Sequence, residues 1–269
     1  MFVLISMLIS IGILAVLLYL SKQRQNSLQR KYELLVDLRQ LLHQCRQHRS
    51  ATHLGLTSEH NPKSELSHLQ DALMETSNHL IATAQFENKP MYRILQLKLK
   101  ALDKEWSDRS VARNQMIHGK TIRHCLFLMD EIAMAWLAES GRDDLSDEYH
   151  LNWQQVVDSM EVLTQLRISI QDMHTEDGAL RVKYYCDKMR RKLNQLALIS
   201  PLSIASPGCS KAMHMLGELT DNPAYDISVE QLYAMTSDVS LSIANVYDQM
   251  LSELTETLYL PLPKVAIAA

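Results

Sequence analysis

The first apolar stretch of the chain runs from Phe2 to Leu20, and its only other residue types are two serines, a glycine and a tyrosine. The first charged side chain is Lys22. At about 1.5 Å per residue, a helix of this length covers nearly all of the ~30 Å hydrocarbon core of a bilayer. We therefore expect residues 1–21 to form a transmembrane anchor.

A cleaved signal peptide is the alternative for this stretch. Such a peptide has a basic start, an apolar core of about 7–15 residues and a cleavage site of the small-x-small type. Here no basic residue precedes the apolar residues, and the stretch ends in Leu17-Leu18-Tyr19-Leu20. The pattern favours a span that is retained.

The basic residues near the span all follow it: Lys22, Arg24, Arg30 and Lys31. Because Lys and Arg are retained on the cytoplasmic side, we expect a single-pass protein of the inner (cytoplasmic) membrane whose soluble domain is cytoplasmic. The four cysteines fit free thiols in a reducing compartment, and their even number leaves disulfides as the alternative.

Beyond the span, apolar residues recur every three or four positions in segments that are separated by Gly, Pro and Asn, as expected for helices. Asp177-Gly178 is interpreted as a break, and residues 200–208 as the longest loop. The expected helices are 2–56, 64–86, 91–106, 110–140, 146–174, 179–199, 209–219 and 228–259.

Short connections and the lack of strand alternation predict an all-α fold. We expect two antiparallel, up-and-down four-helix bundles that share long helices over residues 22–260, followed by an unstructured tail, 261–269. Seven glycines and seven prolines in 269 residues agree with a helical composition. The net charge of −4 gives no basic footprint for nucleic acid.

Catalytic and metal-binding motifs are not found in the sequence. It has no Gly-rich phosphate loop, nucleophile elbow or Cys-x-x-Cys, so we expect neither an enzyme nor a cofactor. Glu65 and His68 form one Glu-x-x-His, but a di-iron bundle needs a second copy, so no metal is expected. The basic run 188–192 is interpreted as a solvated helix face, with a docking surface for an acidic partner or lipid headgroups as the alternative.

Two arginines occupy positions where the helical pattern calls for apolar residues. Arg49 falls in the stripe formed by positions 35, 38, 42, 45, 49, 52 and 56, and Arg167 falls in the stripe 156, 160, 163, 167 and 170. Burying an uncompensated guanidinium group costs several kcal/mol, roughly, so each needs a partner.

The partners expected for Arg49 and Arg167 are of three kinds. One is a carboxylate on a neighbouring helix, with the candidates Glu75, Glu131 and Asp238, and another is the carbonyl groups at a helix end. The third is a bound planar anion, which the guanidinium fork matches with two hydrogen bonds. Either arginine could instead extend to the surface of the bundle. Arg46 and His48 would add charge at the same level of the first helix.

The segment Gln44-Cys45-Arg46-Gln47-His48-Arg49-Ser50 resembles the Gln-x-x-Arg-Gly-x-Ser signature that opens nitrate- and nitrite-sensing (NIT) domains. Leu163-Thr164-Gln165-Leu166-Arg167 resembles the Leu-Gly-x-Leu-Arg of this family, and Leu232 to Thr236 resembles its final helix. Two residues depart from the signature: Ser50 stands in place of its glycine, and His48 in place of the usual acidic residue.

The resemblance implies a membrane-anchored sensor that binds nitrate or nitrite between arginines. Arg49 is then the first ligand candidate and Arg167 the second, with Arg46 and Thr236 beside them. In this family the signal passes to an attached output domain and the bundles often form dimers. Only ten residues follow the last expected helix here, so we expect a stand-alone member that signals through an unknown partner protein, as a homodimer. The alternative is a helical scaffold or interaction protein of the same fold that has lost ligand binding, with its arginines in buried ion pairs.

Overall fold

The structure is a computed structural model that describes residues 2–58, 62–222 and 227–263. Within these ranges the chain is all-helical, as predicted. The α-helices are α1 (Phe2–Thr57), α2 (Lys63–Thr83), α3 (Lys89–Asp103), α4 (Val111–Glu139), α5 (Asp143–Ser169), α6 (Glu176–Ile199), α7 (Pro201–Ile204), α8 (Pro207–Asp221) and α9 (Val229–Leu258). Three 3-10 turns join them: η1 (Phe86–Asn88), η2 (Trp106–Asp108) and η3 (Ile170–Asp172).

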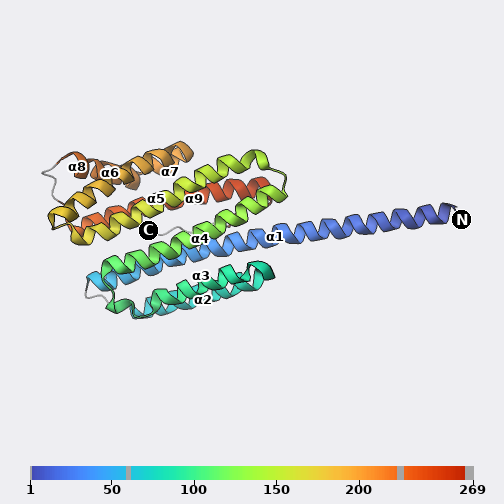
Figure 1. The fold of residues 1–269 in the computed structure, drawn as a ribbon, viewed down its shortest axis with the longest axis horizontal. Coiled ribbons are helices and arrows are strands. Elements are labelled where there is room, and N and C mark those ends of the chain that lie inside the picture. Colours follow the sequence, from blue (N-terminus) through green and yellow to red (C-terminus); the bar gives the residue numbers. More distant parts are fainter. Residues whose placement is uncertain (1, 59–61, 223–226, 264–269) are drawn as a thin grey trace.

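The first part of α1 projects from the rest of the molecule as one straight helix (Figure 1). Its most apolar window has a mean hydropathy of 2.0, and none of that window is buried. The described residues therefore contain one helix that is long and apolar enough to cross a membrane. The same helix continues without a break to Thr57, and from Leu34 onward it contributes core residues such as Leu38 and Leu42.

Two sets of helices pack on either side of the α4–α5 contact. On one side, α1 packs against α2 and α4, and α3 packs against α2 and α4. On the other side, α5 packs against α6 and α9, and α8 lies against both α6 and α9. Apolar side chains from both sets form one continuous core. A Cβ atom on Gly119 of α4 would lie 2.5 Å from the Cγ2 atom of Thr164 of α5, so the two helices meet closely there.

Helices α1 and α9 run antiparallel to each other. Tyr32 packs edge-on against Tyr259 with 5.7 Å between ring centroids, and His53 contacts Tyr233 at 4.2 Å. Between these contacts, Nη2 of Arg39 donates to Oδ2 of Asp248 at 2.7 Å. This pairing brings the last third of α9 next to the part of α1 that follows the apolar span.

Two predicted connections are present but differ in their residues: the chain leaves helix at 173–175 and not at 177–178, and residues 201–204 of the expected loop form α7. Gly178 lies inside the first turn of α6, because the Thr175 side chain caps the helix by accepting from Gly178 N at 3.1 Å. A Cβ atom there would meet the Asp172 carbonyl oxygen at 1.8 Å, so the tight entry into α6 requires glycine. In the expected loop 200–208, Pro201 and Pro207 occupy first-turn positions of α7 and α8, where proline is well tolerated.

The C-terminal segment is attached to α1 as far as the structure describes it. The Tyr32 hydroxyl donates to the Pro261 carbonyl at 2.6 Å, and Nη1 of Arg39 donates to the Pro263 carbonyl. Residues 264–269 of the expected unstructured tail lie outside the described residues.

Candidate functional site

Both arginines on the apolar stripes are buried. Arg49 is 6% exposed and Arg167 is 4% exposed. Each is carried inward by its stripe, with Cys45 one turn before Arg49 and Leu163 one turn before Arg167, both fully buried. The helical periodicity thus predicted the location of both guanidinium groups correctly.

Neutral oxygen atoms of α9 hold Arg167. Its Nε donates to Oγ1 of Thr236 at 3.0 Å, and its Nη2 donates to the Thr236 carbonyl at 2.9 Å. The Tyr233 hydroxyl in turn donates to the Arg167 carbonyl at 3.2 Å and accepts from Nε2 of Gln171 at 3.0 Å. Burial first, and then Arg46, lower the Arg167 pKa to about 9. Arg167 is therefore positioned but not neutralised.

Arg49 makes no side-chain hydrogen bond or ion pair within the described part of the chain. Burial lowers its pKa well below the ordinary arginine value, and repulsion from Arg167 and Arg46 lowers it further. The only groups that oppose this shift are the neutral Tyr247 and Cys45. This buried guanidinium group therefore has no acceptor among the described residues.

Arg46 is even more deeply buried, at 2% exposure. None of its Nε, Nη1 and Nη2 atoms has a hydrogen-bond partner among the described residues. The Tyr247 hydroxyl interacts with it electrostatically, but the pair does not reach full hydrogen-bond geometry. Ser240, one turn after Thr236 on α9, also has a buried hydroxyl without a partner.

The three guanidinium groups form an arginine cluster, Arg46, Arg49 and Arg167, in which the charges of Arg167 and Arg46 lower the Arg49 pKa and the charge of Arg46 lowers the Arg167 pKa. Among the described residues, none of them pairs with a carboxylate, and Glu75, Glu131 and Asp238 do not reach them. The carboxylate of Asp248, on α9, is bound to a different arginine, Arg39. A buried cluster of cations without counter-ions has the chemistry of an anion site.

A cavity of about 30 Å³ lies between Arg49 and Arg167. It exceeds the roughly 10–15 Å³ that a water molecule needs, so it has room for a water molecule or a few-atom ligand. The cavity is lined by Arg49, Ser50, His53, Gln115, Arg167, Tyr233, Thr236 and Ser237. Arg46 lies outside this lining, so of the four predicted ligand residues three share the cavity.

Five polar lining residues were missed at the sequence level. His53 follows Arg49 by one turn and Tyr233 precedes Thr236 by one turn, so helical spacing from the named residues could have found both. The sequence around Gln115 does not indicate that it lines the cavity. Gln115 lies on α4, 66 positions after Arg49, and reaches the cavity only because α4 packs there. Gln115 Oε1 and His53 Nδ1 are buried without partners, and burial with the nearby arginines lowers the His53 pKa to about 4.

A second buried polar cluster lies beside the arginine cluster, between α1 and α4. His118 Nδ1 donates to the Asn114 carbonyl at 2.9 Å, which leaves His118 Nε2 as the acceptor for His48 Nδ1 at 3.0 Å. Asn114 Nδ2 donates to Oγ1 of Thr52 at 2.9 Å. Burial lowers the His48 pKa to about 4, so both imidazoles are neutral at pH 7. His48 therefore joins α1 to α4 and does not add charge to the arginine cluster.

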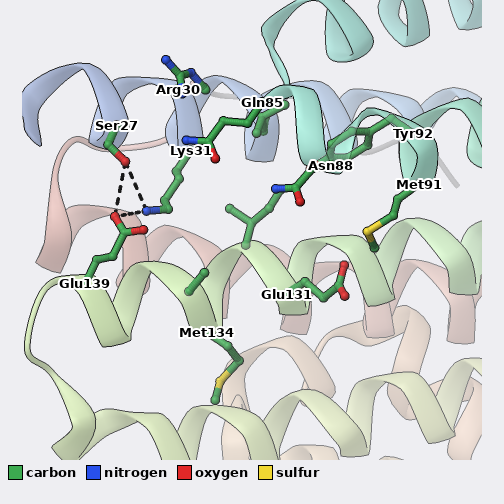
Figure 2. A pocket seen from close by; sticks show the side chains of 13 residues that line it. Ser27, Arg30, Lys31, Gln85, Asn88, Met91, Tyr92, Glu131, Met134 and Glu139 are labelled. Carbon is green, nitrogen blue, oxygen red and sulfur yellow. Dashed lines mark hydrogen bonds and ion pairs between the residues drawn. The ribbon is translucent and has the colours of Figure 1, made fainter. Parts of the chain in front are cut away.

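A larger cavity, of about 440 Å³, opens near the emergence of α1 from the span (Figure 2). Glu139 crosses part of it and is already bound to Lys31 and to the Ser27 hydroxyl. The cavity contains none of the predicted ligand residues. The described residues also contain no group of three His, Cys, Asp or Glu side chains that could hold a metal ion.

Comparisons with known proteins find no matching family model, no matching curated protein and no matching solved structure. The resemblance to NIT domains therefore stays a prediction from short motifs.

Proposed function

We propose that the chain is a membrane-anchored sensor that binds a small oxyanion, such as nitrate or nitrite, at the arginine cluster. In this proposal the fold is a NIT-like pair of four-helix bundles, one of α1, α2, α3 and α4 and the other of α5, α6, α8 and α9. The cluster lies where the two bundles meet.

One observation carries the proposal: three buried arginines converge without a carboxylate. A structural ion pair would bring its counter-ion from the chain, as Asp248 does for Arg39. Arg49 and Arg46 instead keep their donors unused. Since removing a charged group from water is unfavourable by several kcal/mol, roughly, a ligand that supplies the negative charge would stabilise the folded state.

An oxyanion suits the site better than a monatomic ion. Guanidinium groups bind planar oxyanions through two parallel N–H donors. The cavity also offers the Ser50 hydroxyl as a neutral donor, whereas the Ser237 and Tyr233 hydroxyls already donate to the Tyr233 and Arg167 carbonyls. The 30 Å³ volume limits the ligand to a few atoms unless the side chains move.

The membrane side follows from the basic residues after the span, which favour a cytoplasmic domain. About 43 Å of continuous helix separate Leu20 from Arg49. Because the anchor and the first ligand candidate share α1, ligand binding would act on the same helix that enters the bilayer. We expect the signal to pass to a partner chain.

The test is thermal unfolding of the full-length protein in detergent micelles or nanodiscs. Nitrate, nitrite, chloride and sulfate are compared at equal ionic strength, after exhaustive dialysis against a weakly binding buffer. A ligand that binds the folded state only adds RT ln(1 + [L]/Kd), about 2.7 kcal/mol at a concentration of 100 Kd. We expect nitrate or nitrite to raise the Tm more than chloride does.

Two variants assign the effect to the cluster. Arg49→Met should abolish the anion-dependent shift, whereas Arg190→Met should keep it, because Arg190 lies on α6 and pairs with Asp221 at 2.9 Å. Equal shifts with every salt, or a shift that survives Arg49→Met, would overturn the proposal. The alternative of a helical scaffold without a ligand would then stand.

A further inference from the structure

Helix α3 has two apolar faces, and only one of them is in the core. Tyr92, Leu95 and Leu99 are buried against the neighbouring helices. On the second face, Ile94 is 52% exposed and Leu97 is 65% exposed. Together with the exposed Ala101, these residues follow the 3-and-4 spacing of a helical stripe. The second stripe is therefore an apolar face that no described helix covers.

This face borders a groove of about 360 Å³ between α3 and α4. Ala101 of the face lines the groove, whereas Ile94 and Leu97 lie outside its lining. The α4 wall contributes Phe127, which is 45% exposed, together with Ile117 and His124. Helices α3 and α4 pack against each other less extensively than α4 packs against α1 or α5. The groove therefore follows two roughly parallel helices and has the form that accepts a third.

The groove also lies in one of the basic stretches of an acidic protein. Residues 89–128 hold nine Lys and Arg against three Asp and Glu, a net charge of +6 in a chain whose total is −4. Lys98 and Lys120 line the groove, and neither has an ion pair within the described residues. In contrast, the basic run on α6 is largely neutralised: Lys192 pairs with Asp158, and Arg191 pairs with Asp187.

We propose that the α3–α4 groove docks an amphipathic helix of a partner protein, with apolar residues at i, i+3 or i+4, and i+7 and with Asp or Glu along its flanks. Exposed Ile94, Leu97 and Phe127 would meet the apolar residues, and Lys98 and Lys120 would meet the carboxylates. This is the helix-in-groove mode of recognition, with charge complementarity fixing the partner.

The alternatives fit the groove less well. Nucleic acid would set charged phosphates against the exposed Ile94 and Leu97. A lipid headgroup would have to lie far from the bilayer, because Cys125, next to the groove residue His124, contacts Cys45 of α1. About 37 Å of helix separate Cys45 from the end of the span at Leu20. The proposal makes no use of the arginine cluster, so it does not depend on anion binding.

The experiment is photo-crosslinking in membranes of cells that naturally make the protein. A photoreactive phenylalanine analogue replaces Leu97 in the full-length chain, or Leu180, which is 61% exposed on α6, as the matched position outside the groove. Crosslinked peptides are identified by mass spectrometry. We expect Leu97 to capture one other protein through an acidic segment with apolar residues at 3-and-4 spacing, and Leu180 not to capture it.

Charge reversal tests the role of Lys98 and Lys120 at the groove. Lys98→Glu with Lys120→Glu should lower the crosslinked fraction at least tenfold, whereas the control Lys183→Glu, on exposed α6 surface, should leave it unchanged. Thermal unfolding verifies that each variant is folded. If the double charge reversal does not fold, the charge-neutralising variant Lys98→Gln with Lys120→Gln replaces it. Capture of a second copy of this chain, of nucleic acid or of lipid, no capture at all, or capture insensitive to these lysines would overturn the proposal.

Discussion

Arg49 of α1 and Arg167 of α5 line the same small cavity, and Arg167 lowers the pKa of Arg49 instead of being paired with a carboxylate that would raise it. Two like charges buried side by side oppose folding. Natural chains retain such arrangements mainly at functional sites, where the environment of a titratable group serves a ligand or a reaction.

Replacing Arg49 should therefore stabilise the protein when no anion is present. In Arg49→Met a desolvated cation becomes an apolar side chain of similar length, and we expect the free energy of unfolding to rise by about 1–4 kcal/mol. Chemical denaturation of the dialysed full-length protein in micelles measures this change.

Arg39 provides the matched control on the same helix. It is also 6% exposed, but it is bound to Asp248. Arg39→Met leaves that carboxylate without its cation, so we expect a loss of about 3–5 kcal/mol. If Arg49→Met is as destabilising as Arg39→Met, Arg49 has an unrecognised structural partner and the anion argument fails.

The Thr236 hydroxyl should matter through Arg167. Thr236→Val keeps the shape of the side chain but removes the Oγ1 acceptor for Arg167 Nε. A charged donor left without its acceptor is unfavourable by about 1–3 kcal/mol. We expect this loss in denaturant unfolding, together with a weaker anion-dependent Tm shift, whereas Thr257→Val, whose hydroxyl donates to the Glu253 carbonyl within α9, should leave the anion response intact.

The stability of the protein should fall on acidification through His48. Its folded pKa is about 4, below the unfolded value of about 6.5. Between these values the unfolded chain binds the proton and the folded chain does not, so the stabilisation is complete above pH ~6.5 and is lost as the pH falls toward 4. His48→Gln should lose less stability than the parent protein between pH 7 and pH 5.

His79 gives the opposite sign and serves as the control. Its Nδ1 lies 2.7 Å from Oδ2 of Asp37, and this hydrogen bond raises the His79 pKa. The stabilisation from this pair is present at low pH and is lost as the pH rises through the folded pKa of His79. His79→Gln should therefore make the loss of protein stability on acidification steeper. Identical pH profiles for His48→Gln and the parent protein would contradict the neutral His48–His118 pair.

Close packing of α4 on α5 should make Gly119 intolerant of a side chain. A new Cβ would lie 2.5 Å from Cγ2 and 2.7 Å from Oγ1 of Thr164, so a shift of the helices is required. We expect Gly119→Ala to lower the free energy of unfolding by about 1–3 kcal/mol. Thr164→Ala in the same chain should restore part of the loss, since only the Cβ contact at 3.2 Å then remains.

Helical periodicity was sufficient to predict the all-α fold, the long α1 and the burial of Arg49 and Arg167, because these depend on spacing along a single helix. Contacts between distant segments were not predictable in this way. The Arg39–Asp248 pair and the His48–His118 pair connect residues that no local pattern relates.

The errors in helix boundaries have a local physical cause. Glycine usually weakens a helix, so the sequence predicts a break at Gly178, but the Thr175 cap and the close Asp172 carbonyl favour glycine in the first turn of α6. Pro207 was assigned to a loop, whereas proline suits the first helical turn because its missing N–H is not needed there.

Because α1 is unbroken, it also fixes the angle about the helix axis between its N-terminal apolar residues and Arg49. Each residue turns a helix by about 100°, so the face of the span and the direction of Arg49 keep one constant phase. Seven residues added after Leu20 would restore that phase to within about 20°, whereas two would turn it by about 200°. The rotational orientation of the apolar segment of α1 is therefore fixed relative to the arginine cluster.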